Sequence, residues 1–325
     1  MENQTVISEV FLVGFPGVPE DLHNLVAAVM FLVYVFSLTA NGSVICLVTL
    51  NMYLHQPMYL IIANLAASNL LFDTVTLPKL IARYWFGSSS INFKVCIFQM
   101  FCVHFFGSID SYLLMLMAVD RYIAISQPLR YTLVITNKRT LVTCSFFWIL
   151  AASSRSATVS TQFSKIVLCG PDPNKINTLF CTHGAIMDMY MDCTDVTSMR
   201  NESFVSAMVV LLVCLGIIVL SYILIIVEIA TSYRSDIWRK AFYTCTTHLL
   251  VVALYFVPRL FLYIVSNISS ISAIIVQPDI NALLLFFYSV VPHLANPVIY
   301  FLRTKEIRQT FAKVLQRIKY RVGHM

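Results

Sequence analysis

Charged side chains are scarce in this sequence, which has 325 residues, 58% of them hydrophobic and only 12% charged. An ordinary soluble domain carries roughly 25% charged residues. A chain with so little charge has too few polar groups to cover a water-exposed surface, so much of it must face lipid. The composition therefore predicts a membrane protein and argues against a soluble one.

Motifs that mark catalytic sites are also missing. The chain contains no Gly-rich phosphate loop, no His-Glu-x-x-His, no Cys-x-x-Cys and no Gly-x-Ser-x-Gly, and it has only nine glycines. We therefore expect neither an enzyme nor a bound cofactor. Inverted repeats typical of transporters and a polar filter typical of channels are not visible either. The net charge of +6 arises from basic residues at predicted membrane edges, so no nucleic acid is expected as a partner.

Long apolar windows, by contrast, are abundant. A helix needs about 20 mostly apolar residues to cross a bilayer, because lipid offers no partners to backbone polar groups. Seven windows meet this requirement: residues 24–54, 58–77, 95–119, 140–164, 204–227, 241–265 and 280–302. The predicted fold is all-α, a bundle of seven transmembrane helices with short loops.

The positions of Lys and Arg indicate the orientation of this bundle. Basic residues concentrate in the segments that lie on the same side as the C-terminus, and the positive-inside rule places that side in the cytoplasm. With an odd number of spans, the N-terminus is then extracellular. We expect a multi-pass plasma-membrane protein with an extracellular tail (1–23), a seven-helix domain (24–303) and a cytoplasmic tail (304–325).

The cytoplasmic tail has its own pattern. Ile307, Phe311, Val314 and Leu315 recur at helical spacing, with Lys and Arg between them. This pattern is typical of a short amphipathic helix that lies on the inner membrane surface and contacts lipid.

Four of the nine cysteines, Cys96, Cys169, Cys181 and Cys193, fall on the outer side. In an oxidising compartment they indicate two disulfides, and spacing alone leaves three pairings open. The N-terminal tail also carries the sequon Asn-Gln-Thr, which predicts glycosylation at Asn3.

Strings at the inner ends of the windows identify a family. Asp-Arg-Tyr at 120–122 ends the third window, and Asn-Pro-Val-Ile-Tyr at 296–300 ends the seventh. Together they resemble the rhodopsin-like G-protein-coupled receptors. Pro-Met-Tyr at 57–59, Met-Ala-Val-Asp-Arg-Tyr-Ile-Ala-Ile at 117–125 and Lys-Ala-Phe-Tyr-Thr-Cys-Thr-Thr-His-Leu at 240–249 resemble vertebrate odorant receptors in particular.

This resemblance covers nearly the whole chain, and the strings at 54–56 and 183–195 are closer to the fish-like class of these receptors. It implies an odorant receptor that binds a small molecule in the outer half of the bundle. The receptor would activate a heterotrimeric G protein of the cAMP-raising olfactory type, in the cilia of sensory neurons. The alternative is a rhodopsin-like receptor for a non-olfactory metabolite, which the sequence does not distinguish.

The resemblance also implies roles for single residues. Arg121 would be held near Asp120 at rest and released toward the G protein on activation; a structural ion pair at the membrane edge is the alternative. Pro297 removes a backbone hydrogen bond and makes the seventh helix deformable. The other implied switch residues are Tyr122, Tyr222, His248, Asn296 and Tyr300. The implied disulfides are Cys96 with Cys181 and Cys169 with Cys193.

Asp110 is a carboxylate inside the third window, where a charge costs about 2.5–3.5 kcal/mol unless it is paired or hydrated. Odorant receptors usually carry an acid at this position. They also usually carry an Asp in the second helix, where this chain has Asn69. Asn41, Asn69 and Asn296 around Asp110 are consistent with a sodium site, and equally with a protonated Asp110 in a polar network.

Arg259 follows Pro258 in the sixth window, at the expected depth of the ligand. A buried arginine favours planar anions, so one hypothesis is an acidic or zwitterionic, water-soluble odorant. The other is an internal ion pair with an acid of the outer loops, for which the candidates are Asp188, Asp192, Asp195 and Asp279. The remaining predicted pocket residues are His104, Gly107, Ser108, Ser111, Phe256 and Tyr263. Arg155, in the fourth window, has no explanation in the family pattern.

Overall fold

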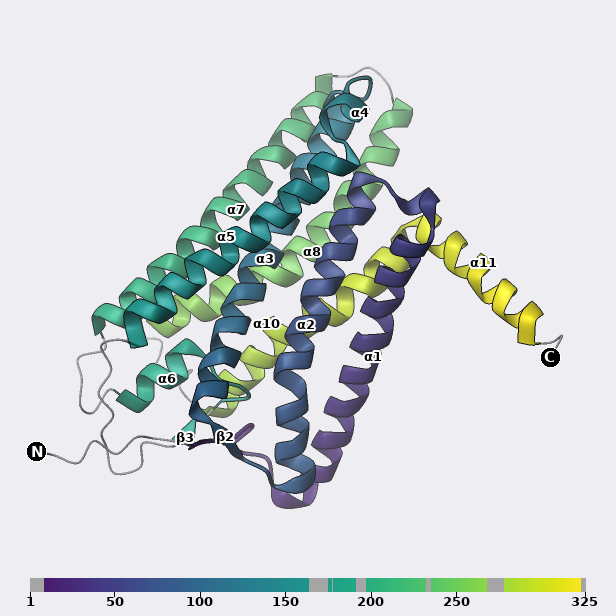
Figure 1. The fold of residues 1–325 in the computed structure, drawn as a ribbon. Coiled ribbons are helices and arrows are strands. Elements are labelled where there is room, and N and C mark those ends of the chain that lie inside the picture. Colours follow the sequence, from purple (N-terminus) through teal and green to yellow (C-terminus); the bar gives the residue numbers. More distant parts are fainter. Residues whose placement is uncertain are drawn as a thin grey trace, which may run out of the picture.

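The structure is a computed structural model, and it describes residues 9–163, 175–176, 178–190, 197–231, 235–267 and 278–322. In the described part of the chain, the long helices lie side by side in an elongated bundle, and the helix near the C-terminus leaves it at an angle (Figure 1). The bundle consists of α1 (His23–Leu50), α2 (Pro57–Phe86), α3 (Phe93–Ser126), α5 (Asn137–Phe163), α7 (Thr197–Thr231), α8 (Ser235–Asn267) and α10 (Pro278–Arg303). The eighth helix is α11 (Lys305–Val322).

Each predicted window falls on one of the bundle helices, so the seven-helix prediction is confirmed. Among the described residues, six helices are long and apolar enough to cross a membrane: α1, α2, α3, α7, α8 and α10. The seventh, α5, is equally long, but Arg155 and a run of Ser and Thr lower its hydropathy. It packs against α2 and α3 within the bundle.

Short polar segments set the ends of the helices. Pro57 occupies the first turn of α2, where its missing N–H is not needed, and Gly87 ends the helix in a left-handed conformation with φ of 66°. The side chain of Asn92 caps α3 by accepting a hydrogen bond from the backbone N–H of Lys94. These caps allow α2 and α3 to reverse direction within a few residues.

Burial separates the inner and outer faces of the bundle. Leu65, Ile109 and Leu113 are completely shielded between helices, whereas Leu32 and Ile226 are about two-thirds exposed along the outside. Large exposed aliphatic side chains on such long helices are what a lipid environment accommodates.

A small sheet at the N-terminal end of the bundle was not predicted from the sequence. Strand β1 (Glu9–Leu12) pairs antiparallel with β2 (Ser90–Asn92) and parallel with β3 (Lys175–Ile176). Val10 and Leu12 of β1 are buried. The fold is thus helical with one short three-stranded sheet, in which the N-terminal segment is held against the segment after α2.

Gly14 continues this packing. Its φ is 82°, and a Cβ there would lie 2.6 Å from the hydroxyl of Tyr84. The same hydroxyl accepts a hydrogen bond from the backbone N–H of Phe15 at 2.6 Å. The close approach therefore requires glycine, and it joins the N-terminal segment to the C-terminal end of α2.

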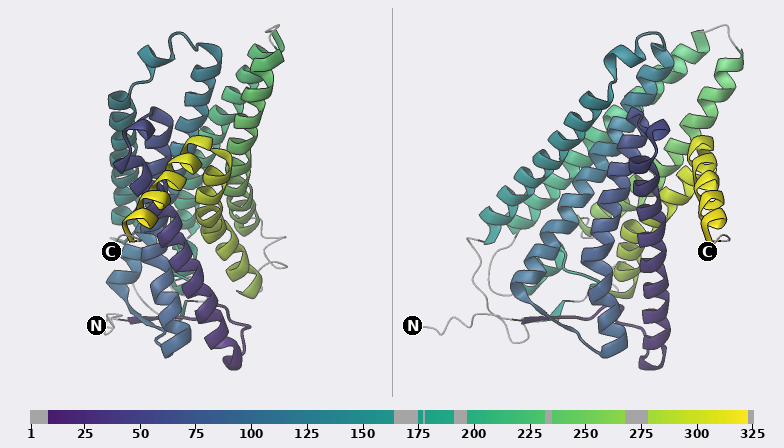
Figure 2. Two further views of the ribbon diagram at one scale, coloured as in Figure 1. Left: turned by 90° about the vertical axis from the view of Figure 1, so that its right-hand side faces the viewer. Right: turned by 45° about the vertical axis from the view of Figure 1, so that its right-hand side comes forward.

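The connecting segments contain the remaining short elements: the 3-10 turns η1 (Glu20–Leu22) and η2 (Met52–Leu54), and the helices α4 (Tyr131–Val134) and α6 (His183–Tyr190). The two views of Figure 2 show the sheet at the opposite end of the bundle from α4. Helix α11 contacts α10 through the edge-to-face rings of Phe301 and Phe311, 5.1 Å apart, and Ile307 is buried there. The predicted tail helix is therefore present.

Candidate functional site

A hollow lies between α3, α5, α7, α8 and α10. Its cavity volume is only about 30 Å³, so a ligand requires side chains to change rotamer. Six of the seven residues predicted to bind ligand line it: His104, Gly107, Ser108, Ser111, Arg259 and Tyr263. The other lining residues are Val103, Arg155, Ala207, Val210, Leu211 and Tyr288.

Phe256, the seventh predicted residue, does not line the hollow. Its ring is buried and packs at 5.0 Å, nearly perpendicular, against the ring of Tyr255. The sequence placed Phe256 at the correct depth, but the direction of its side chain depends on how α8 is rotated in the bundle. Phe256 is therefore a packing residue and not a candidate ligand contact.

Arg259 of α8 is 95% buried, with its guanidinium carbon 4.1 Å from the ring centre of Tyr255 and 5.2 Å from that of Tyr288. Its Nη1 has no hydrogen-bond acceptor. No carboxylate forms an ion pair with it among the side chains that the structure describes; those of Asp188, Asp192, Asp195 and Asp279 lie outside that set.

Arg155 of α5 also enters the hollow and is 94% buried. Its Nε donates to the hydroxyl of Ser108 on α3, and its Nη1 donates to the hydroxyl of Ser206 on α7, each at 3.0 Å. Both acceptors are neutral. The sequence offered no role for Arg155, because the serines that it contacts are far from it in the chain.

Some of the neutral polar groups of the hollow have hydrogen-bond partners, and one does not. The hydroxyl of Ser111 lies 3.0 Å from that of Tyr255. The Nε2 atom of His104 is buried without a hydrogen-bond partner, and the His104 ring faces that of His183 at 6.2 Å. His104 thus has an open hydrogen-bonding position next to the two arginines.

Deeper in the bundle, an imidazole bridges two carboxylates. Nδ1 of His293 on α10 lies 2.8 Å from Oδ1 of Asp73 on α2, and its Nε2 lies 3.7 Å from Oδ2 of Asp110 on α3. All three side chains are almost fully buried. Asp73 also accepts a hydrogen bond from the hydroxyl of Ser37. Sequence reasoning missed Asp73 and His293, although each is an ionisable residue within an apolar window.

The asparagines predicted to surround Asp110 form a neighbouring group. Asn41 donates to the backbone oxygen of His293 at 3.3 Å, and Asn69 donates to Asn41 at 3.5 Å. Asn296 is buried nearby, and its side-chain oxygen has no partner. None of the three forms a hydrogen bond to Asp110, whose Oδ2 instead lies 3.7 Å from Nε2 of His293.

At the end of the bundle where α4 lies, Asp120 accepts a hydrogen bond from the hydroxyl of Tyr131 on α4 at 2.7 Å. No ion pair between Asp120 and Arg121 is found among the described residues. The hydroxyl of Tyr222 on α7 lies 2.7 Å from Nδ1 of His248 on α8.

The other predicted switch residues lie on α3 and α10. Tyr300 is buried, and its hydroxyl contacts the sulfur of Met117 at 3.7 Å. Tyr122 is half-buried next to Arg121, and Pro297 lies inside α10 directly after Asn296. The side chains of residues 240–244 lie outside the described set.

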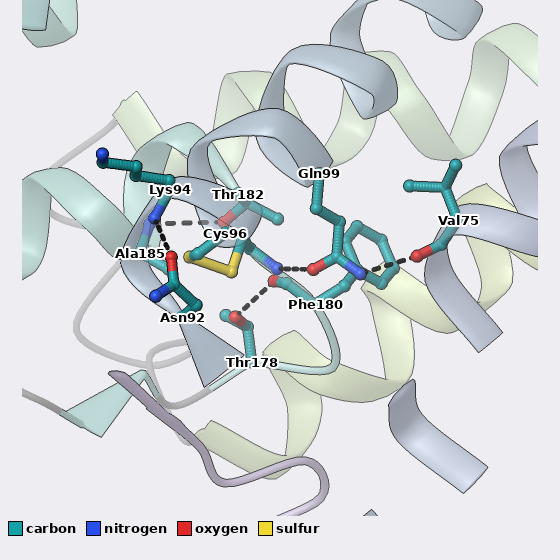
Figure 3. Close-up of a disulfide and its surroundings, with 10 residues drawn as sticks. Val75, Asn92, Lys94, Cys96, Gln99, Thr178, Phe180, Thr182 and Ala185 are labelled. Atoms are coloured by element: carbon teal, nitrogen blue, oxygen red, sulfur yellow. Dashed lines mark hydrogen bonds between the residues drawn. A yellow bond between two sulfur atoms is a disulfide. The ribbon is translucent and has the colours of Figure 1, made fainter. Parts of the chain in front are cut away.

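A disulfide joins Cys96 at the start of α3 to Cys181, 85 residues later. Gln99 supports it, because its side chain accepts from the backbone N–H of Cys181 at 2.9 Å and donates to the carbonyl of Val75 at 2.8 Å (Figure 3). The pairing implied by the resemblance is thus present. The predicted Cys169–Cys193 disulfide and the sequon at Asn3 lie outside the described residues.

The arrangement of seven helices with this disulfide defines a seven-transmembrane receptor fold. A crystal structure of squid rhodopsin matches it with a TM-score of 0.66, covering 93% of this chain and 87% of that chain at 16% identity. That likeness shows the fold, and sequence comparison shows the family.

The sequence pattern of the olfactory receptor family matches residues 30–318. Human olfactory receptor 10G4 is 32% identical over 321 residues, which cover 98% of this chain and 99% of that protein. Human olfactory receptor 52B6 is 34% identical over 309 residues, which cover 94% of this chain and 88% of that protein. The chain belongs to the olfactory receptor family. It is therefore a multi-pass plasma-membrane receptor for small-molecule odorants that couples to G proteins, and it is not an enzyme.

Proposed function

We propose that this receptor responds to a small anionic odorant that binds in the hollow, with its carboxylate paired to Arg259. The observation that carries the proposal is a guanidinium that is 95% buried and has no carboxylate partner among the described side chains. A buried charge without a counter-charge is strongly unfavourable. An anionic ligand would supply the missing partner through paired N–H···O bonds.

The surroundings of Arg259 suit such a ligand. The guanidinium carbon lies over the rings of Tyr255 and Tyr288, and these cation–π contacts stabilise the cation. Val103, Leu211 and the other aliphatic lining residues would cover the carbon chain of the odorant. The ligand would thus be a short organic acid rather than an inorganic anion.

Agonist binding at this depth would be transmitted to the inner face through α8, which carries both Arg259 and His248. We propose the olfactory type of heterotrimeric G protein, with a rise in cAMP, as the output, and Arg121, Tyr222 and His248 as the switch. The same proposal includes four further features of the receptor. It belongs to the fish-like class and lies in cilia, its N-terminus is extracellular and glycosylated at Asn3, and α11 contacts the inner leaflet.

The test is a cAMP assay in cells that express the receptor with an olfactory-type G protein. Carboxylic acids are compared with the amides and methyl esters of the same acids, which have nearly the same shape and no charge. We expect the acids alone to activate, and Arg259→Gln to abolish this selectivity with surface expression unchanged. Lys94→Gln, which removes an exposed basic residue at the start of α3, is the matched control.

An internal ion pair predicts a different pattern. If an acid of the outer loops neutralises Arg259, replacement of Asp188, Asp192, Asp195 or Asp279 by Asn will disturb the receptor as much as Arg259→Gln does. Full potency of every acidic agonist on Arg259→Ala would also contradict the proposal.

A further inference from the structure

We infer that the agonist carries two anionic groups: the hollow is built for a short dicarboxylate whose ends pair with Arg259 and with Arg155. The inference rests on the proposed function, because it takes the hollow as the agonist site. It adds a second anchoring residue that the family pattern does not explain.

The two guanidinium groups converge on adjacent residues of α3. A Cβ placed on Gly107 would lie 3.4 Å from Nη1 of Arg259 and 3.5 Å from its guanidinium carbon. The next residue, Ser108, accepts a hydrogen bond from Nε of Arg155. Arg259 reaches this turn of α3 from α8, and Arg155 reaches it from α5, so they lie on two sides of one hollow.

No charge in the lining compensates these two cations. None of the twelve residues that line the hollow is acidic, and no ion pair of Arg155 or Arg259 is found among the described side chains. Serine hydroxyls and tyrosine rings stabilise a guanidinium without neutralising it. Like charges repel strongly where water is excluded, and a single carboxylate would leave one of the two positive charges uncompensated.

The remaining lining fits the middle of a diacid. Val103, Val210 and Leu211 add aliphatic surface to the lining of the same hollow, and the free Nε2 of His104 offers one additional polar contact. An ammonium group has no carboxylate to pair with in this lining. The hollow should therefore favour plain dicarboxylates over amino dicarboxylates of the same length.

Three matched series test the inference in cells that express the full-length receptor. The dicarboxylates succinate, glutarate and adipate are compared with their monomethyl esters, which keep the length but lose one charge, and with butyrate, valerate and hexanoate. Glutamate serves as the amino counterpart of glutarate. Potency is read from cAMP, and surface expression is measured in parallel.

We expect the best dicarboxylate to be about ten- to a hundredfold more potent than its monomethyl ester, the range for one charge-assisted hydrogen-bonded contact. Arg155→Gln keeps a side-chain donor for Ser108 and removes the charge, so it should eliminate this preference while the ester retains its potency. Arg155→Lys should preserve part of the preference. Lys94→Gln should change neither value.

Each other outcome overturns the inference in a distinguishable way. If esters or monocarboxylates match the dicarboxylates, or if Arg155→Gln weakens both series equally, Arg155 only joins helices, and the proposed acid receptor stands without a second anionic site. If no acid activates the surface-expressed receptor, both the dicarboxylate inference and the proposed function fail.

Discussion

Nδ1 of His293 lies 2.8 Å from Oδ1 of Asp73, and the other nitrogen of the same ring faces Asp110. An imidazolium would present one N–H to each carboxylate, which places an internal cation between α2, α3 and α10. The imidazole of His293 thus occupies the position that the sequence analysis considered for sodium. This geometry favours a polar network around Asp110 over sodium coordination, but the partner of Asp110 in that network is His293 and not one of the predicted asparagines.

Sodium provides the first prediction. Replacing sodium by choline should leave the melting temperature of the purified wild-type receptor unchanged, because His293 already lies between Asp73 and Asp110. His293→Gln removes the imidazole between the two buried acids, so this variant should have a lower melting temperature than wild type. Sodium should raise that melting temperature again, because a ligand that binds only the folded state stabilises it. A wild-type receptor that is stabilised by sodium but not by choline would contradict this.

The partner of His293 provides the second prediction. Asp73→Asn should lower the free energy of unfolding by about 3–5 kcal/mol, the usual cost of removing one member of a buried charged pair. Asn69→Asp places an acid one turn away on α2, at the position where the resemblance leads us to expect one, and serves as a comparison. If the imidazole acts through Asp73 specifically, Asn69→Asp will not rescue Asp73→Asn in a thermal melt.

The span positions could be predicted because each depends on composition within one continuous window. The Asp73–His293 contact could not, because it joins residues 220 positions apart. The family pattern directed attention to Asn69, whereas Asp73 lies one turn further along α2. Asp73, His293 and Arg155 are all ionisable residues inside apolar windows, but the contacts that they make depend on how the helices pack.

The direction in which a side chain points from its helix also could not be predicted from the sequence. Phe256 and Arg259 are both in the outer half of α8, yet only Arg259 lines the hollow, and the rotation of a helix about its axis depends on packing with its neighbours. The strand β1 was missed for a related reason. Its four residues carry a weak pattern, and their partners in β2 and β3 lie far along the chain.

The disulfide leads to the third prediction. Cys96→Ser should abolish surface delivery or the ligand response, because the link closes a loop of 85 residues and such links contribute about 2–4 kcal/mol. Cys181→Ser and the double variant should behave in the same way. Cys46→Ser, which alters an exposed free cysteine of α1, is the control. Normal surface staining and response in Cys96→Ser would disprove the role of this link.

The inner-face pair leads to the fourth prediction. Tyr222→Phe removes the hydroxyl that meets His248, and the net loss for one such bond is about 1 kcal/mol. His248→Asn should have a comparable effect. The double variant should be as stable as the less stable of the two single variants, because both changes remove the same interaction. Melting temperatures provide the comparison, with Tyr53→Phe at an exposed site as control. Additive losses would show that the two side chains act independently.

The outer loop segment leads to the last prediction, which concerns pH. Burial, reinforced by the positive charge of Arg200, lowers the pKa of His183 from its ordinary 6.5 to about 4. As the pH falls, the unfolded chain therefore takes up this proton first. The stability that neutral His183 contributes is complete above about pH 6.5 and declines toward about pH 4.

The neutral form of His183 also has a defined partner, since its Nε2 lies 2.8 Å from the hydroxyl of Ser203 at the start of α7. Acid should therefore loosen α6 from α7 and lower the melting temperature between neutral pH and about pH 5. His183→Gln keeps a polar group near Ser203 but cannot titrate, so it should flatten this part of the pH profile. His55→Gln, an exposed histidine on the other side of the membrane, should leave the profile as in wild type. An unchanged profile in His183→Gln would assign the acid sensitivity to another group, such as His104, whose ring faces His183.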